Sequence, residues 1–210
     1  MEMAVQKAVR RTQEERAAET RLRLLDATIT LLLERGYSRT TTTDIAAAAG
    51  VSRGALTHHF ASKEEIVTRA VQHQLRNVTA DLHRLADELK GVSTDDVIDY
   101  LWDMMAGGLF LVTLEYLPEA RHNPDFKAQM VPVVKEFHAA LDTIWTRLSE
   151  YAGLDPARAK VMLNATMCLI RGMVAQTIVR DDPDYFQNLL AYWKDHLRET
   201  FILKECAAKQ

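Results

Sequence analysis

The chain has 210 residues and is 48% hydrophobic, which allows a full core in one or two domains. Eight glycines, five prolines and the lack of alternating β-branched runs favour an all-α fold over a sheet protein. The net charge of −3 is unevenly spread, because residues 1–60 hold nine Lys and Arg against seven Asp and Glu. A mildly positive amino-terminal part on an acidic body is a weak indication of nucleic-acid binding.

The chain begins with a charged, aperiodic stretch, residues 1–17, which predicts a flexible basic arm. Lys7, Arg10 and Arg11 could reach phosphates from this arm, and a merely solvated tail is the alternative. A first helix is predicted from residue 18 to Gly36. Its apolar stripe consists of Ala18, Leu22, Leu25, Ile29, Leu32 and Leu33.

Residues 40–63 predict two short helices separated by a tight turn. Thr43 or a neighbouring threonine can cap the first helix, Gly50 can adopt the left-handed conformation that ends it, and Ser52 can cap the second. The second helix runs roughly over residues 53–60. This layout is that of a helix-turn-helix, whose second helix can enter a DNA major groove.

The outward side of the second helix offers groups that suit base edges and phosphates. With Leu56 and Phe60 turned inward, Arg53 is the best candidate for a bidentate contact with guanine, because only its fork matches O6 and N7. Ala55 and the methyl group of Thr57 could touch thymine methyl groups. The predicted DNA-binding residues are Arg39, Thr41, Thr42, Thr43, Ser52, Arg53, Gly54, Ala55, Thr57, His58, His59 and Lys63.

The residues from Asp44 to Glu64 form the pattern D-I-A-x-A-A-G-V-S-x-G-x-L-x-x-H-F-x-S-K-E. This pattern resembles the amino-terminal signature of the tetracycline-repressor (TetR) family of one-component bacterial regulators, and the resemblance covers roughly residues 18–78. It implies a three-helix helix-turn-helix DNA-binding domain over residues 18–64. A helical bundle for ligand binding and dimerisation would follow over residues 65–210.

The resemblance also extends to individual residues. Positions that commonly lie at the DNA in this family correspond here to Thr42, Arg53, Gly54, His58, His59 and Lys63. One position departs from the family pattern, because Thr57 stands where the family often has a tyrosine that touches a DNA phosphate. The threonine hydroxyl reaches less far.

Beyond the helix-turn-helix, Ser62 and Glu65 form a capping box at the start of a long helix predicted over residues 63–90. A break follows at residues 91–93. The next helix is apolar on nearly all sides over residues 104–117, which predicts that it is buried in a bundle.

Glycine and proline mark the boundaries of the later helices. Gly107 and Gly108 predict a kink, a close helix contact or a cavity wall, and breaks are predicted at Pro118 and at residues 121–124. The helices predicted after these breaks run over residues 124–151 with a kink at Pro132, about 156–180 with Asp155 as N-cap, and about 183–204.

The carboxy-terminal helices contain candidates for an apolar ligand pocket, although aromatic and methionine side chains are also ordinary core residues. The candidate pocket residues are Trp102, Met105, Phe110, Tyr116, Met130, Phe137 and Met167. The polar groups that could orient a ligand are His138, Asn164, Arg171 and Gln176.

The last two helices carry wide apolar stripes that could pair with a second copy to form a four-helix bundle. The family resemblance implies that this is the dimer interface, and an intramolecular core is the alternative. The candidate interface residues are Cys168, Gly172, Ala175, Leu189, Trp193 and Leu197. Dimerisation is favoured, because two recognition helices about 34–36 Å apart can read a palindrome, whereas one short helix gives little specificity.

Catalytic and metal-binding motifs are not evident. His58 and His59 are adjacent on a helix and point about 100° apart, so they cannot chelate one ion well. Glu119 and His122 have the spacing of a di-iron motif, but the sequence has no second copy and the flanking prolines predict a turn there. We therefore expect no enzyme activity, no cofactor and no metal.

Targeting signals are also not evident. The amino terminus lacks the apolar segment of a signal peptide, and the longest apolar run, residues 104–114, is too short to span a bilayer. Cys168 and Cys206 lie in no motif and favour reduced thiols. These features predict a soluble cytoplasmic protein with no membrane partner.

Together these observations predict a homodimeric, all-helical transcriptional regulator. In this hypothesis it is a repressor that binds a palindromic DNA operator and is released by a small, mainly apolar effector. The alternative is a dimeric DNA-binding regulator or nucleoid-associated factor with no small-molecule effector. A helical enzyme or carrier is the third and least favoured class.

Overall fold

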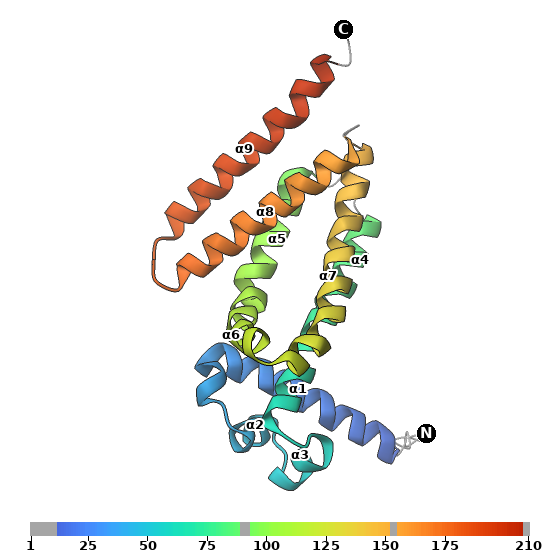
Figure 1. The fold of residues 1–210 in the computed structure, drawn as a ribbon, viewed down its shortest axis with the longest axis vertical. Coiled ribbons are helices and arrows are strands. Elements are labelled where there is room, and N and C mark those ends of the chain that lie inside the picture. Colours follow the sequence, from blue (N-terminus) through green and yellow to red (C-terminus); the bar gives the residue numbers. More distant parts are fainter. Residues whose placement is uncertain (1–11, 89–92, 152–154, 208–210) are drawn as a thin grey trace, which may run out of the picture. The chain divides into compact units, whose positions relative to one another are not determined.

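The computed structural model describes residues 12–88, 93–151 and 155–207, and within these ranges every regular element is a helix (Figure 1). The predicted all-α fold is therefore confirmed. In chain order the elements are α1 (Gln13–Arg39), α2 (Thr42–Ala48), α3 (Arg53–His59), α4 (Lys63–Glu88), α5 (Thr94–Met104), the π-helical turn η1 (Met105–Leu109), α6 (Phe110–His122), α7 (Pro124–Tyr151), α8 (Pro156–Thr177) and α9 (Pro183–Ala207).

The chain divides into two compact units, Met1–Ala70 and Val71–Gln210, and the division falls inside α4. Unit 1 contains α1, α2, α3 and the first turns of α4. Unit 2 contains the rest of α4 together with α5 to α9. The sequence prediction placed the end of the first domain at residue 64, whereas unit 1 ends at Ala70.

α1 begins earlier than predicted. The Thr12 hydroxyl accepts a hydrogen bond from the Glu15 amide, and the Glu15 carboxylate accepts one from the Thr12 amide, so a capping box starts the helix at Gln13. The predicted aperiodic arm of residues 1–17 is therefore too long by five residues. Lys7, Arg10 and Arg11 lie outside the described residues.

The buried face of α1 also differs from the predicted stripe. Leu22 and Leu33 are 47% and 43% exposed, although both were assigned to that stripe. The side chains that α1 buries are Leu24, Leu25, Thr28, Leu31 and Leu32. The sequence allows two adjacent apolar stripes on this helix, and the packing of the other helices in unit 1 covers only one of them.

The helix-turn-helix forms as predicted, with one change in its cap. Thr41, rather than Thr43, caps α2, because its hydroxyl accepts from the Asp44 amide and the Asp44 carboxylate accepts from the Thr41 amide. Gly50 has a φ of 64°, and the Ser52 hydroxyl accepts from the Ala55 amide at 3.1 Å to cap α3.

The core of unit 1 fixes α3 from its inner side. Leu56 and Phe60 are each 1% exposed. They belong to a single apolar cluster that joins α1, α2, α3 and the start of α4, made of Leu24, Leu25, Leu31, Ile45, Ala46, Ala49, Leu56, Phe60, Ile66 and Ala70. The short helix α3 therefore depends on tertiary packing, since seven residues are too few to be stable alone.

Arg23 of α1 stabilises the turn between α2 and α3. Its guanidinium donates to the carbonyl of Ala49 and, at 3.4 Å, to that of Gly50, the two residues that follow α2. A Cβ atom on Gly50 would lie 2.8 Å from the Arg23 Nη2 atom. Glycine at this position thus serves both the left-handed backbone and the close approach of the arginine.

Two glycine substitutions are expected to act in opposite directions. Gly50→Ala should destabilise the protein by at least about 1–2 kcal/mol, because alanine is strained at positive φ and its methyl group displaces Arg23. Gly54→Ala should stabilise it by up to about 1 kcal/mol, because Gly54 is helical and its added Cβ meets only Ser52 Oγ at 3.8 Å. Urea denaturation followed by circular dichroism measures both, and equal effects would contradict the assigned turn.

Unit 2 is a bundle in which α8 packs against α5, α6 and α7, and α9 packs against α5. α4 and α7 lie side by side (Figure 1), where the Gln72 side chain donates to the Gln129 carbonyl at 3.0 Å and Arg147 pairs with Asp87 at 2.8 Å. The predicted start signal of α8 is present, since Asp155 precedes Pro156 and accepts from the Arg158 amide. Half of the capping box predicted for α4 forms. Ser62 accepts from the Glu65 amide, but the Glu65 carboxylate accepts from the Ala61 amide instead of the Ser62 amide.

The glycine pair lies in the π-helical turn between α5 and α6. Gly108 is buried and has a φ of 117°, so the helix is irregular at this position, as the predicted kink requires. The break predicted at Pro118 is wrong, because α6 continues through that proline to His122. Tyr116, two residues before the proline, is buried, whereas the adjacent Leu117 is 47% exposed.

One helical stretch of the described residues, Thr94–His122, is long and apolar enough to cross a membrane, with a mean hydropathy of 1.4. It is longer than the run over 104–114 considered in the sequence, since η1 and α6 continue the helix. Val97, Ile98 and Leu101 on it are fully buried. Core helices of soluble bundles have the same composition, so this stretch is weak evidence for a membrane span.

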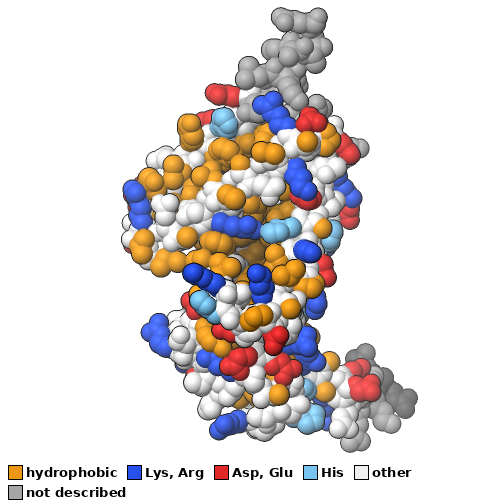
Figure 2. Space-filling model, in the orientation of Figure 1, with side chains coloured by type: hydrophobic (Ala, Val, Ile, Leu, Met, Phe, Trp, Pro, Cys, Tyr) orange, Lys and Arg blue, Asp and Glu red, His pale blue; other side chains and the backbone are white. Residues whose placement is uncertain are grey.

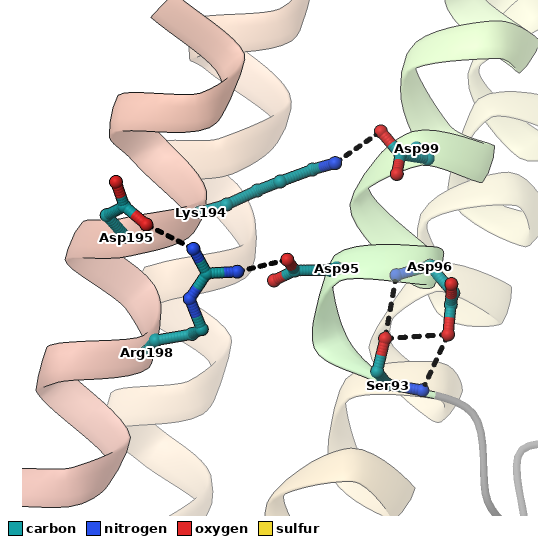
Figure 3. Close-up of polar contacts among 7 residues, drawn as sticks. All are labelled: Ser93, Asp95, Asp96, Asp99, Lys194, Asp195 and Arg198. Atoms are coloured by element: carbon teal, nitrogen blue, oxygen red, sulfur yellow. Dashed lines mark hydrogen bonds and ion pairs between the residues drawn. The ribbon is translucent and has the colours of Figure 1, made fainter.

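Polar contacts attach α9 to the start of α5 (Figure 3). Lys194 pairs with Asp99 at 2.5 Å, and Arg198 pairs with Asp95 and with Asp195 on its own helix. The start of α5 is capped by Ser93, which accepts from the Asp96 amide. The pairs with Asp99 and Asp95 lie on the side of α9 that faces α5.

Candidate nucleic-acid interface and ligand pocket

α3 presents the side chains predicted to contact bases on its solvent side. Arg53, the first residue of the helix, is exposed, and among the described residues no carboxylate or carbonyl pairs with its guanidinium. Gly54 and Thr57 are exposed, and Ala55 is half-buried. The helix is therefore held by its inner side and offers an unpaired arginine fork on its outer side.

Three of the predicted hydroxyl groups already have intramolecular partners. Thr41 donates to the Asp44 carboxylate at 2.6 Å and, like Ser52, serves as a helix cap. The Thr57 hydroxyl donates to the Gly54 carbonyl at 3.0 Å, so it must turn away before it can donate to a phosphate. These bonds keep the two short helices in place, and a role at DNA would be additional.

The two adjacent histidines of α3 differ in their surroundings. Their rings meet edge to face with centroids 5.4 Å apart. The ring centroid of His59 lies 6.4 Å from that of Phe60, whereas His58 is exposed. Burial, followed by the positive charges of His58 and Arg21, lowers the pKa of His59 below its ordinary value. At neutral pH His59 is therefore uncharged and can donate only one N–H to a phosphate.

Lys63 has a structural role that the sequence does not predict. Its ammonium donates to the Tyr37 carbonyl at 2.7 Å and lies 4.1 Å from the centroid of the Tyr37 ring. The lysine thus joins the start of α4 to the end of α1. A DNA phosphate would have to compete with this pair.

The other predicted phosphate-contacting residues lie near the start of α2. Thr43 is exposed and Thr42 is half-buried, while the exposed Arg39 donates through Nε to the Arg35 carbonyl at 3.0 Å. Sequence reasoning did not single out Arg21, whose guanidinium lies 5.4 Å from the centroid of the Phe60 ring. No local spacing marks such a residue, because its partner is distant in the chain.

Unit 2 contains a pocket of about 500 Å³, formed by α4, η1, α6, α7 and α8. Figure 2 shows a hollow in which apolar side chains are surrounded by basic ones. Five candidate pocket residues line it, namely Met105, Phe110, Tyr116, Met130 and Phe137. The other two lie elsewhere. Trp102 packs on Phe186, with the ring centroids 6.3 Å apart, and Met167 is a buried core residue.

The polar lining of the pocket comes partly from the predicted set. His138 and Arg171 line it, with the Arg171 Nη2 atom 3.5 Å from the His138 Nε2 atom. Asn164 and Gln176 do not line it, and Asn164 donates instead to the Lys160 carbonyl. Lys127 and Lys135 also line the pocket, although sequence reasoning did not select them. Both are exposed residues of α7.

Comparison with known proteins agrees with this geometry. The family model for bacterial regulatory proteins of the tetR family matches residues 24–70, which hold α2, α3 and most of α1. The HTH-type transcriptional regulator CymR of Pseudomonas putida is 28% identical over 184 residues, covering 86% of this chain and 90% of CymR. The chain belongs to the TetR family.

Solved structures extend the similarity to the whole TetR fold. A TetR-family regulator from Mesorhizobium loti superposes with a TM-score of 0.71 at 16% identity, covering 90% of this chain and 97% of that one. A regulator from Saccharomonospora viridis in complex with choline superposes with a TM-score of 0.67 at 19% identity, covering 86% of this chain and 96% of that one. At these identities the similarity establishes the fold, and the TetR-family relatives are transcriptional regulators.

Most residues predicted for the dimer interface of this TetR-family chain lie on an uncovered side of α8 and α9. Cys168 and Gly172 are exposed, and Ala175 and Leu189 are half-buried. Trp193 is also half-buried, but its indole N–H donates to the Thr166 hydroxyl of α8 at 2.9 Å inside the protomer. Leu197 is different, because it is only 1% exposed and belongs to the core of the protomer. The sequence assigned it to the interface since it continues the apolar stripe of α9, but α9 turns this part of the stripe inward.

The described residues include no group of three His, Cys, Asp or Glu side chains placed to hold a metal ion. The Glu119–His122 segment is part of α6, so the turn predicted there is wrong. The Glu119 carboxylate accepts from the Asn123 amide side chain at 2.7 Å, at the end of that helix. Cys206 lies in a part of α9 whose side chains are not described.

Proposed function

We propose that this TetR-family protein is a homodimeric, cytoplasmic repressor that binds a palindromic operator and is released by a small, mainly apolar effector. The observation that carries the DNA-binding part is the pair Arg53 and Gly54 on the solvent side of α3. Arg53 has no partner within the described residues, and Gly54 is not required by any close intramolecular contact. A guanine edge would accept the arginine fork, and the missing Cβ would allow close approach of the DNA backbone.

The uncovered side of α8 supports dimerisation. It carries small and apolar side chains at helical spacing, with Val161 69% exposed and Ala165, Cys168 and Gly172 also exposed. On α9 Tyr192 is 70% exposed. Exposed apolar side chains along two antiparallel helices suit pairing with the same helices of a second copy, which would form a four-helix bundle.

The pocket in unit 2 supports an effector. Its volume of about 500 Å³ lies within the range of small-molecule sites, and side chains do not fill it. The choline complex of the Saccharomonospora viridis regulator is an example of a small molecule bound by this fold. The open pocket speaks against the alternative, a DNA-binding factor with no effector.

A route for coupling is available through α4. This helix lines the pocket with Leu75 and begins at Lys63, directly after the helix-turn-helix in the chain. An effector that displaces Leu75 would move the same helix that enters unit 1. Release from DNA further requires that the effector bind the free state more tightly than the DNA-bound state.

A matched pair of glycine substitutions tests whether the protein dimerises through α8 and whether DNA binding requires the dimer. An added Cβ meets no atom within 4 Å at either Gly172 on α8 or Gly107 in η1. Gly172→Arg is expected to yield a monomer in native mass spectrometry and to abolish the gel shift of a palindromic fragment from the upstream region of the gene. Gly107→Arg, with the same change in size and charge, is expected to leave both unchanged.

A Gly172→Arg protein that remains dimeric would contradict the proposed interface. A dimeric wild-type protein that binds no double-stranded fragment would contradict the DNA-binding function itself. The same native mass spectra show whether a small molecule co-purifies with the protein, which would be its effector or a mimic of it.

A further inference from the structure

The charged side chains that line the pocket in unit 2 are all basic. Four basic side chains line it, namely Lys127, Lys135, His138 and Arg171, and no Asp or Glu does. Figure 2 shows basic side chains around the hollow on this face. The remaining lining is predominantly apolar and includes Met105, Leu109 and Met130, all buried.

Arg171 is the innermost of these basic groups. It is half-buried, and within the described residues its guanidinium has no carboxylate within ion-pair distance. Its hydrogen-bond contact within the described residues is with His138, whose Nε2 atom lies 3.5 Å from Nη2, and the Tyr116 hydroxyl and Cys168 thiol also lie close enough to interact with its charge. A guanidinium removed from water without a negative partner is unfavourable, because its charge loses hydration and gains no compensating interaction.

His138 does not compensate the charge of Arg171. Its Nε2 atom lies beside a group that can only donate, and an imidazole brings no negative charge to the guanidinium in either protonation state. Burial, followed by the nearby Arg171, lowers the pKa of His138, and Asp142 opposes this shift. The two lysines add further positive charge to the pocket lining, since within the described residues neither Lys127 nor Lys135 has an acidic partner.

We infer that the effector is an amphipathic anion, an apolar molecule with one carboxylate or phosphate group that binds Arg171 and His138 while its body fills the apolar pocket. This inference rests on the proposed effector function and names the chemical class of the ligand. A carboxylate or phosphate accepts two parallel N–H bonds from the guanidinium. A cation such as a quaternary amine would find no carboxylate among the lining residues and would be repelled by Arg171.

Two fluorescent probes that differ by a single anionic group test this inference on the full chain. 1-Anilinonaphthalene-8-sulfonate and N-phenyl-1-naphthylamine share the same rings, and only the first carries a negative charge. Titration with each probe gives its dissociation constant. We expect the sulfonate to bind about tenfold or more tightly than the neutral probe, since hydrogen bonds to charged groups contribute on this scale.

Substitutions assign the preference to the pocket. Arg171→Met removes the charge and retains an apolar side chain, and it should weaken sulfonate binding by about tenfold or more while changing the neutral probe less than about twofold. Lys135→Gln, at an exposed position that should not affect folding, should weaken sulfonate binding alone and by less. Arg158→Met is the matched control, because Arg158 is an exposed residue of the same helix α8 outside the pocket and should change neither constant.

Displacement distinguishes the source of the anion. Decanoate, decyl phosphate and decanol compete for the bound sulfonate probe, and the acid that displaces it at the lowest concentration identifies the preferred group. The inference is overturned if decanol displaces the probe as well as both acids do, or if Arg171→Met leaves the sulfonate constant unchanged. If the neutral probe binds as tightly as the sulfonate, the effector pocket stands and only its charge preference is lost. If neither probe binds, the effector part of the proposed function fails together with the inference.

Discussion

Arg53→Ala is expected to abolish specific DNA binding without unfolding the protein. Each good bidentate contact between arginine and guanine contributes about 1–3 kcal/mol, and a dimer has two copies, so the loss is about 2–6 kcal/mol, or at least roughly thirtyfold in affinity. The fold should be unaffected, because Arg53 is exposed and within the described residues has no intramolecular partner. Fluorescence anisotropy of an operator fragment at several salt concentrations measures the loss.

Salt dependence separates loss of base recognition from loss of charge. Arg158→Ala removes the same charge from an exposed position of α8 and should leave operator affinity unchanged. If Arg53→Ala lowers affinity for the operator and for random DNA equally, Arg53 contacts a phosphate rather than a base. If the variant binds the operator as well as the wild type in rising salt, α3 is not the recognition helix.

Phe60→Ala is expected to unfold unit 1. Phe60 is 1% exposed in the apolar cluster of this unit, and truncating a buried phenylalanine costs about 3–5 kcal/mol. Unit 1 is small, so a loss of this size is comparable to its whole stability. Loss of operator binding together with a separate low-temperature transition in circular dichroism would show this result.

Two variants serve as controls for Phe60→Ala. Phe60→Leu keeps an apolar side chain and should cost about 1.5 kcal/mol or less. Val179→Ala removes atoms from a side chain that is 88% exposed and should change stability by less than about 0.5 kcal/mol. An equal, small effect of all three substitutions would contradict the role of Phe60 in the core.

The helix-turn-helix was largely predictable because its signals are local. Ser52, Gly50 and the pair Leu56 and Phe60 act within one or two turns of their own helix, so their residue types predict the cap, the turn and the buried side. The exception shows the limit of this reasoning. Four consecutive threonines, Thr40 to Thr43, precede Asp44, and Thr41 caps α2 because only it has an aspartate at the third helical position.

Proline was a poorer guide than glycine. α6 continues through Pro118, where the sequence predicted a break, although proline inside a helix removes a hydrogen bond and clashes with the preceding turn. Pro132 lies inside α7, in agreement with the helix predicted over residues 124–151. Near these prolines Tyr116 and Val133 are buried in unit 2. Packing of the flanking turns outweighs the local cost, and it is not visible in the sequence around a proline.

The candidate pocket was only partly predictable. Aromatic and methionine residues of the middle helices were selected by type, and five of the seven line the cavity. Their type could not separate them from Trp102 and Met167, which pack elsewhere. Lys127 and Lys135 were overlooked because exposed lysines on a helix usually have no special role, and their significance comes from facing the same cavity as Arg171.

Residue types and their short-range spacing alone determined that the chain is helical, where the second helix of the helix-turn-helix begins, and which arginine lies exposed on it. Only tertiary structure decided which stripe of α1 is buried, that Leu197 turns inward, that Lys63 pairs with Tyr37 and that Arg171 meets His138. The physical reason is the range of the interactions. Caps and turns are satisfied within a few residues, whereas burial and charge compensation depend on groups that come together only when distant helices pack.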